Sequence, residues 1–510
     1  MAKISQVFFQ NATNNPDKIA VWCEDVMVTY ASLAHLVKNW SYGLLQKGVQ
    51  RGDHIGVLLP NNIEFVALIL VASSLGVVLV PLNISLPISA IARSFQSADV
   101  KHVIATSNIL KSLVKQDKFN FAFVNGIWFS IDNEYPGFDS LNNLSRDVSD
   151  DSLLQNLSQD TDPFILTMTS GSTGEPKPII LTQQTKWNRA FSAVELYDIT
   201  TQDVTLAATP LYHSLAERLA LIPILTSGTL VLMTRFSASE WLRIVSKYSV
   251  TFTIAVSSQL SQISKQLAKK TEHKIISLRC IVSSSAKLNT NVKAELLSHL
   301  HCDFHECYGT SEIAIASNLN TKACPDKLDS VGKVAPGVDI KILKANNEVA
   351  APTEVGEIVC KTPMVFSGYF KKTEATQKAM WGEYFQTGDI GCLDQEGFLY
   401  FLGRKKEIII SGGINIYPSD IEAVISDHPL VKECAVFAIA DERLGEAVGV
   451  AIIPNNLNDF EVRTIRFYCA EHLADYQQPR KIFVVDELPK NGMGKIMRQE
   501  LISQFGEFKP

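Results

Sequence analysis

One segment constrains this chain more than any other: a loop rich in hydroxyl groups and glycine, set between two apolar runs. It reads Thr169-Ser170-Gly171-Ser172-Thr173-Gly174-Glu175-Pro176-Lys177, and the flanking runs are 164–166 and 179–181. Hydroxyl side chains offer hydrogen-bond donors, and glycine lets backbone N–H groups converge on an anion. The pattern therefore predicts a strand, a phosphate-holding turn and a second strand, with Lys177 adding a positive charge.

This loop is not the phosphate loop of the P-loop NTPases. That loop needs a glycine five residues after its first glycine and a Lys-Ser or Lys-Thr end, whereas here Pro176 precedes Lys177. For an isolated stretch of this composition, a flexible surface loop is the plain alternative. The choice between the two depends on the rest of the chain.

The length of 510 residues predicts at least two domains, because a single hydrophobic core stops growing at about 250 to 300 residues. Helix-like and strand-like segments alternate before the loop and again after it, which predicts two lobes with parallel sheets covered by helices. We expect helices near 30–45, 62–75 and 238–247, and strands at 54–59, 77–80, 103–105, 204–208, 229–233, 252–256 and 281–284.

From about residue 331 to 402, short β-like runs divided by Gly, Pro and Asn predict a small antiparallel β subdomain, with strands at 340–343, 356–360 and 398–402. A compact unit with helices at 420–426 and 460–473 and strands at 435–440, 449–453 and 482–485 follows. Ser419 and Glu422 have capping-box spacing, which predicts the start of its first helix.

The predicted fold class is therefore α/β. A large N-terminal domain, residues 1–403, contains two α/β sheet lobes and the β subdomain. A smaller, mobile α+β domain, residues 404–510, follows a charged hinge at 403–407.

Charge and composition narrow the class of partner and compartment. The net charge of -6 argues against a general polyanion binder, so nucleic acid is not an expected partner. Nine cysteines without a Cys-x-x-Cys pair, and no apparent secretory signal, predict a cytoplasmic protein.

The longest apolar run, 65–82, is broken by Ser73, Ser74, Gly76 and Pro81. These breaks favour a buried helix that ends at Gly76, followed by a buried strand, over a transmembrane span.

Five further motifs, in order after the loop, resemble those of the adenylate-forming superfamily, which contains acyl-CoA synthetases, peptide-synthetase adenylation domains and luciferases. They are Pro210-Leu211-Tyr212-His213, Tyr308-Gly309-Thr310-Ser311-Glu312, Thr387-Gly388-Asp389, Gly403-Arg404 through Ser411-Gly412-Gly413 to Glu422, and Pro489-Lys490-Asn491-Gly492-Met493-Gly494-Lys495-Ile496-Met497-Arg498. Each motif alone is a weak signal. Together, in this order, they make a chance match implausible.

The resemblance implies an ATP-dependent carboxylic acid:CoA ligase with ATP, Mg²⁺ and coenzyme A as cofactors. A substrate carboxylate attacks the α-phosphate of ATP to give an acyl-adenylate and pyrophosphate, and a thiol then displaces AMP. Both steps build negative charge, which cations and N–H donors stabilise. Three alternatives stay open: an acyl carrier protein as the acceptor in place of CoA, a nucleotide-binding protein with a decayed site, and a homodimer rather than a single chain.

The same resemblance assigns roles to individual residues. Lys495 is the implied catalytic cation on the α-phosphate, Glu312 the ligand of Mg²⁺, and His213 an orienting contact to the acid, with a core histidine as the alternative. Thr169 is a second metal contact. The cofactors are expected at Thr169, Ser170, Gly171, Ser172, Thr173, Gly174, Lys177, Ser285, Ala286, Tyr308, Gly309, Thr310, Ser311, Asp389, Arg404, Ser411, Gly412 and Gly413.

Departures from the family pattern bear on specificity. Ser284-Ser285-Ala286-Lys287-Leu288 stands where the family usually has Gly-Gly-Ala-Pro-Leu, so side chains replace hydrogens near the expected acyl pocket and a long straight acid is disfavoured. The phrases at 210–213, 410–422 and 488–491 look closest to those of CoA ligases that act on aryl or short to medium acids. Leu444 replaces a Trp that stacks on CoA in some ligases. Glu217 and Arg218 follow His213 on one predicted helix, where they line a polar substrate pocket or form a solvated face.

Overall fold

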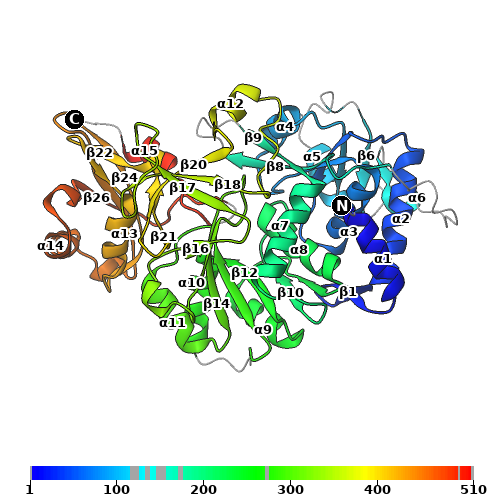
Figure 1. Ribbon diagram of the computed structural model, residues 1–510, viewed down its shortest axis with the longest axis horizontal. Coiled ribbons are helices and arrows are strands. Elements are labelled where there is room, and N and C mark those ends of the chain that lie inside the picture. Colours follow the sequence, from blue (N-terminus) through cyan, green and yellow to red (C-terminus); the bar gives the residue numbers. More distant parts are fainter. Residues whose placement is uncertain are drawn as a thin grey trace.

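Two large sheets covered by helices form the bulk of the molecule, which we describe from a computed structural model. It describes residues 3–114, 124, 126–132, 138–144, 157–170, 176–269, 275–491 and 494–506. Within these residues, the first sheet has seven strands in the order β7-β6-β5-β3-β4-β8-β9, and the second has nine in the order β16-β15-β14-β13-β12-β10-β11-β1-β2. Figure 1 shows the helices packed around both sheets and the C-terminal unit at one end.

The first sheet contains the strands that flank the hydroxyl-rich loop. Its members are β3 (His54–Leu58), β4 (Val78–Pro81), β5 (His102–Ala105), β6 (Trp128–Ser130), β7 (Asp139–Ser140), β8 (Pro163–Ser170) and β9 (Pro176–Thr182). Its described pairings are parallel except for β8 with β9, which form an antiparallel hairpin. The two predicted strands that flank the loop are therefore confirmed, while residues 171–175 between them lie outside the described residues.

The second sheet draws on both ends of the N-terminal domain. Its members are β1 (Ile19–Cys23), β2 (Val26–Thr29), β10 (Val204–Ala207), β11 (Thr229–Leu232), β12 (Phe252–Val256), β13 (Cys280–Ser284), β14 (Asp303–Tyr308), β15 (Ser317–Asn320) and β16 (Lys333–Val334). Strand β1 pairs in parallel with β11, about 200 residues later along the chain. The alternation in the sequence contained no sign of this crossover between the lobes.

Helices cover the sheets, and some of them begin at a side-chain cap. They are α1 (Ile4–Asn14), α2 (Tyr30–Gln46), α3 (Ile63–Leu75), α4 (Ile88–Ser97), α5 (Ser107–Val114), α6 (Leu141–Leu144), α7 (Gln183–Leu196), α8 (Ser214–Thr226), α9 (Ala238–Lys247), α10 (Ser257–Leu267) and α11 (Thr290–His299). The side chain of Thr182, for example, accepts a hydrogen bond from the N–H of Thr185, so α7 starts directly after β9.

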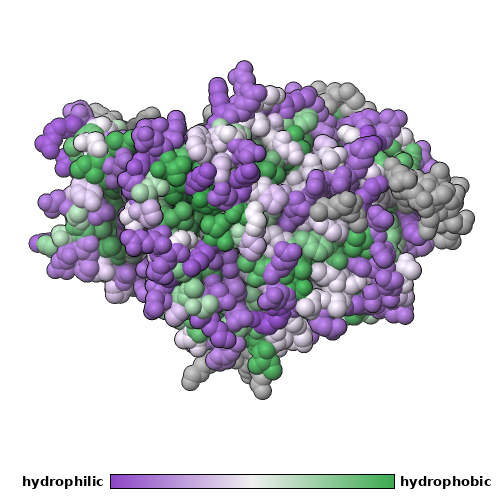
Figure 2. Space-filling model, in the orientation of Figure 1, coloured by the Kyte–Doolittle hydropathy of each residue, from purple (hydrophilic) through white to green (hydrophobic). Residues whose placement is uncertain are grey.

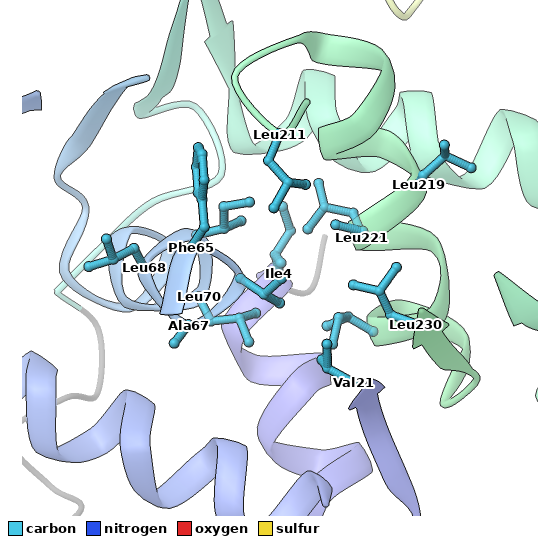
Figure 3. Close-up of a cluster of buried hydrophobic side chains, with 14 of the residues drawn as sticks. Ile4, Val21, Phe65, Ala67, Leu68, Leu70, Leu211, Leu219, Leu221 and Leu230 are labelled. Atoms are coloured by element: carbon cyan, nitrogen blue, oxygen red, sulfur yellow. The ribbon is translucent and has the colours of Figure 1, made fainter. Parts of the chain in front are cut away.

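Helix α3 lies in the centre of a core shared by the two lobes. Asn62 caps its start, and Gly76 ends it in the left-handed conformation with φ of 69°. Its side chains pack with those of α1 and α8, as Figure 3 shows for Phe65, Leu221 and Ile4. The predicted buried helix is confirmed, and no helix among the described residues is long and apolar enough to cross a membrane.

The β subdomain and the C-terminal unit follow in the predicted order. The subdomain comprises β17 (Asp339–Leu343), β18 (Gly356–Lys361), α12 (Thr373–Lys378), β19 (Met380–Trp381), β20 (Tyr384–Leu393) and β21 (Leu399–Arg404). The C-terminal unit comprises β22 (Ile409–Ser411), β23 (Ile414–Ile416), α13 (Pro418–Ser426), β24 (Val431–Asp441), β25 (Gly445–Pro454), α14 (Val462–His472), β26 (Lys481–Val484) and α15 (Arg498–Phe505). On the face in Figure 2, hydrophobic residues gather between this unit and the rest of the molecule.

The predicted capping box at the start of α13 is wrong. Pro418 occupies the first helical position, and the cap residue Tyr417 makes no side-chain hydrogen bond. The hydroxyl of Ser419 donates to the carbonyl of Leu402 at 2.7 Å, so it joins the helix to β21. The Glu422 carboxylate instead accepts from the N–H of Val436 at 2.7 Å. Tertiary partners have taken both groups that a capping box would use.

Candidate active site

The two ends of the hydroxyl-rich loop are held in register by the β8–β9 hairpin. Thr169 pairs with Lys177, and Ser170 with Pro176. The hairpin thus places both ends of the loop side by side, at the end of β8 and the start of β9. The predicted contacts at Gly171, Ser172, Thr173 and Gly174 lie outside the described residues.

The segment after β14 makes a turn that only glycine permits. A Cβ atom at Gly309 would lie 1.5 Å from the carbonyl oxygen of Ala314. At the end of this turn the carbonyl of Glu312 accepts from the N–H of Phe366 at 2.7 Å and from Arg189 Nη2 at 2.8 Å. These bonds anchor the backbone of Glu312, while its carboxylate accepts from the Tyr369 hydroxyl at 3.3 Å.

Three predicted residues from three separate motifs meet around one buried carboxylate, that of Asp389. Its Oδ2 accepts from the Tyr308 hydroxyl at 2.8 Å, and its Oδ1 lies 3.0 Å from Arg404 Nε. Asp389 and Arg404 are cross-strand neighbours on β20 and β21. Burial raises the pKa of Asp389, and the charge of Arg404 opposes that rise. The group joins an acid, a phenol and a guanidinium, the donor and acceptor types suited to a nucleotide's sugar and base.

Lys495 lies within electrostatic range of this group although it belongs to the C-terminal unit. Burial, and then repulsion from Arg404, lower the pKa of Lys495, whereas the charges of Glu407 and Asp389 act in the opposite direction. The backbone around it is closed by Asn491, whose side-chain oxygen accepts from the N–H of Lys495 at 3.0 Å. The structure therefore brings Lys495 together with the Asp389 group.

The loop that carries Lys495 is packed against the second lobe. Gly494 has φ of +72°, and a Cβ atom there would lie 2.5 Å from Ser258 Oγ of α10. Elsewhere along the same boundary, Asn291 Nδ2 donates to Asp427 Oδ1 at 2.6 Å. The positive φ favours glycine at 494, and the lack of a side chain there lets the C-terminal unit lie close to Ser258 of the large domain.

Ser411, Gly412 and Gly413 form the tip of the β22–β23 hairpin. Gly412 and Gly413 have φ of 56° and 83°, which favours glycine at both positions. The N–H of Gly412 donates to the carbonyl of Leu444 at 2.9 Å, so this tip is tied to its own unit. Leu444, the departure from the family Trp, packs directly beneath it.

His213 immediately precedes α8, and its ring is neutral at pH 7. Burial lowers its pKa to about 4, and its Nε2 atom has no hydrogen-bond partner among the described residues. Ser285 follows β13 with φ of 79°, a conformation that favours glycine, at a position where the family pattern has glycine. The Ser257 hydroxyl at the start of α10 donates to the carbonyl of Ala286. The histidine and this turn are candidates for the acid-binding side of the site.

Sequence reasoning missed two residues that support the site, Lys186 and Arg189 on α7. Arg189 donates to the Met364 carbonyl, the Ser214 hydroxyl and the Glu312 carbonyl at 2.8–3.1 Å, so it braces the metal-binding candidate. Lys186 forms a fully buried ion pair with Glu217. A single cation within a helix carries no local signal, since only its neighbours in space show that it is buried.

Fold and site together define an adenylate-forming enzyme, in which a two-lobed domain supplies Asp389 and Arg404 and the C-terminal unit supplies Lys495. The chain matches the AMP-binding enzyme family over residues 8–370 and the C-terminal domain of AMP-binding enzymes over residues 420–495. The chain belongs to the family of AMP-binding enzymes.

Similar proteins of known activity cover nearly the whole chain. The 2-succinylbenzoate–CoA ligase of Bacillus subtilis (strain 168) is 32% identical over 495 residues, 96% of each chain, and that of Geobacillus kaustophilus (strain HTA426) is 30% identical over 496 residues, also 96% of each. These relatives confirm the prediction that the chain is an AMP-forming acid–thiol ligase.

Solved structures agree with that assignment. The o-succinylbenzoate CoA synthetase of Bacillus subtilis in complex with its acyl-adenylate intermediate has a TM-score of 0.86 at 29% identity, covering 97% of each chain. The same enzyme with ATP and magnesium ion has a TM-score of 0.84 at 28% identity, covering 97% of this chain and 98% of that one. The predicted fold, acyl-adenylate route and cofactors ATP, Mg²⁺ and CoA are confirmed.

Proposed function

We propose that this ligase activates an aryl or short to medium carboxylic acid, with 2-succinylbenzoate, the acid in its relatives' names, as the first candidate. The observation that carries the site assignment is Lys495 lying within electrostatic range of Asp389 and Arg404, because residues from separate motifs far apart in the chain meet there. Ser285 narrows the choice of acid, since a side chain occupies a turn that favours glycine. A long straight acid fits this pocket poorly.

The residues divide the adenylation step among them. Asp389 accepts hydrogen bonds from the ribose hydroxyls, and Tyr308 offers its ring to the adenine. Lys495 places its charge at the α-phosphate, where negative charge increases in the transition state. Neutral His213 orients the attacking carboxylate without drawing it into an ion pair. Thr169 to Lys177 hold the outer phosphates.

The metal chemistry fits the donors that are present. No cluster of three or more His, Cys, Asp or Glu side chains suited to a metal occurs among the described residues. Mg²⁺ needs no such cluster, because it retains waters and substrate phosphates and takes only one or two protein carboxylates. Glu312 supplies one, oriented by the hydroxyl of Tyr369. Bound Mg²⁺ would neutralise charge on the phosphates.

We assign the second step to a different placement of residues 404–510. In the present arrangement, Lys495 is the residue of this unit that interacts with Asp389 and Arg404, which we assign to nucleotide binding. The hairpin tip at Gly412 and Gly413 is bonded to Leu444 of its own unit. Rotation about Lys406 would exchange them, so that the tip guides the pantetheine arm of CoA.

We place the protein in the cytoplasm, because all nine cysteines are free thiols and six of them are buried. The competing functions are transfer of the acyl group to a carrier protein and nucleotide binding by a decayed site, and a homodimer is a separate proposal about assembly.

Carboxylate-dependent exchange of labelled pyrophosphate into ATP tests the proposal. We would run it with 2-succinylbenzoate, benzoate, hexanoate, adipate and hexadecanoate, followed by detection of the acyl-CoA. Exchange with an aryl or short acid, together with its CoA thioester, is the expected result. Exchange with hexadecanoate alone would contradict the pocket assignment. Exchange without any CoA thioester would remove CoA as the acceptor.

A further inference from the structure

The interior beside α8 contains more positive than negative side chains. Lys186, Arg189 and Arg218 are all buried there, and the one acid among them, Glu217, is paired with Lys186. The carboxylate of Glu312 also acts on Arg189 through its charge. Figure 1 shows α7 and α8, which carry the three cations, side by side. Charges inside a protein are normally balanced by partners.

Two of these cations have clear partners. Lys186 has the Glu217 carboxylate, and Arg189 donates to three oxygen acceptors that join α7 to neighbouring segments. Both therefore act in the architecture of the large domain. Their pKa values are lowered by burial and, further down the order of causes for Lys186, by the charge of Arg218. Arg218 thus adds a third positive charge close enough to act on both Lys186 and Arg189.

Arg218 is the cation that the described residues leave uncompensated. Its side chain is 8% exposed, and its Nε atom is buried without a hydrogen-bond acceptor among the residues that the structure describes. The titratable groups acting on it most strongly are Cys307 and Tyr197. Burial raises the pKa of both, so both are neutral at pH 7 and neither supplies a negative charge.

The position of Arg218 connects it to the acid-binding side of the site. It lies five residues after His213, the residue before α8, roughly 7 Å further along the helix axis and about 140° around it. Cys307, its neighbour, interacts with the side chain of Ser284, the last residue of β13 before the turn at Ser285. Arg218 is therefore linked through Cys307 to the segment assigned to the acyl pocket.

We propose that Arg218 binds a second anionic group of the substrate, so that the enzyme is selective for acids with a carboxylate at each end. This inference rests on the proposed function, because it concerns the far end of the same pocket. A guanidinium matches a carboxylate with two parallel hydrogen bonds, and its buried edge is otherwise unpaired. The incoming diacid brings the missing negative charge into the interior.

The test compares a diacid with its half-amide in pyrophosphate exchange. For 2-succinylbenzoate, the ring carboxylate is converted to a carboxamide. Wild type is expected to prefer the diacid, by kcat/KM, and Arg218→Gln to reduce that preference by about 10- to 150-fold, the range for a hydrogen bond to a charged group. The loss should appear mainly in the KM for the diacid, and Arg218→Lys should restore part of it. The ratio is independent of how much of a variant folds.

Arg279→Gln is the matched control. Arg279 lies in the same lobe and is paired with Asp203 through Nε at 2.7 Å, so its loss weakens the fold but should leave the preference unchanged. An equal preference in wild type and Arg218→Gln would overturn the assignment, as would a wild type that uses half-amides as well as diacids. Absence of exchange with every acid would instead overturn the proposed function and this inference with it.

Discussion

Two arginines in this enzyme, the buried Arg218 and the partly buried Arg498, have opposite surroundings. Arg498, at the start of α15, donates to Glu407 Oε2 at 2.7 Å, to both carboxylate oxygens of Glu422 at 2.8 Å, and to the carbonyl of Val436 at 3.0 Å. Arg218, in the large domain, has no carboxylate partner among the residues that the structure describes. The first is balanced by two acids of its own chain and holds the C-terminal unit together, whereas the second lacks a counter-charge until a ligand supplies one.

The contrast shows how a cation's role follows from its acceptors rather than from its burial alone. Arg498 lies three residues after Lys495, and Glu407 acts on both. The network thus fixes the base of the loop that presents Lys495. If Arg498 has a structural role and Arg218 binds substrate, substitution of Arg498 should lower stability, whereas substitution of Arg218 should change the preference among substrates.

Arg498→Met should produce the largest loss of stability. It leaves Glu407 and Glu422 without their shared cation, and losing the hydrogen bonds between charged groups in this partly buried network costs about 1.5 to 3 kcal/mol. Urea unfolding followed by a probe in the C-terminal unit would measure it. Arg480→Met is the control, because its pair with Asp441 at 3.6 Å is largely exposed and should contribute below about 1 kcal/mol. Equal effects of the two substitutions would contradict a structural role for the network.

Lys495→Ala should lower adenylation by about 10²-fold or more, the scale for losing one charge at a transition state, and leave the fold intact. Thioester formation from preformed acyl-AMP should be largely retained. Rapid-quench assays of each half-reaction separate the two steps, with Lys432→Ala as an exposed lysine control in the same unit. Equal losses in both half-reactions would rule out the alternation of the C-terminal domain.

His213→Asn tests whether burial of the neutral His213 ring makes the stability of the fold depend on pH. Because the pKa of His213 is lowered to about 4 from 6.5, its neutral form stabilises the fold above pH 6.5, and that contribution is lost as pH falls from 6.5 towards 4. Between pH 7 and 4.5, wild type should lose roughly 2 kcal/mol more stability than the variant. Parallel denaturation curves at the two pH values decide this. Identical pH dependence would mean that the ring is accessible to protons in the folded state.

Arg218→Gln should have the smallest effect on the free protein. Replacing an unpaired buried cation by a neutral amide removes repulsion on Lys186 and Arg189, so stability should stay within about 1 kcal/mol of wild type or rise. Thermal unfolding without substrate measures it. A loss comparable to that of Arg498→Met would show that Arg218 is already compensated within the fold.

Much of the fold was predictable because it depends on short-range patterns. The apolar run at 63–75, with Asn62 before it and Gly76 after it, specifies a buried helix through its own residues. The alternation of strands and helices predicts both lobes for the same reason. The capping box at Ser419 failed because Pro418 already starts the helix and Leu402 and Arg498 take the polar groups.

The sequence by itself determined the order of elements, the glycine-dependent turns and, through motif order, the family to which the enzyme belongs. Only the tertiary structure decided that β1 crosses into the second sheet, that Lys495 lies within electrostatic range of Asp389, and that Arg218 is buried without an acid among the described residues. Those facts depend on contacts between residues far apart in the chain. Charge balance in particular is a property of a volume, and no local stretch of sequence records which side chains share it.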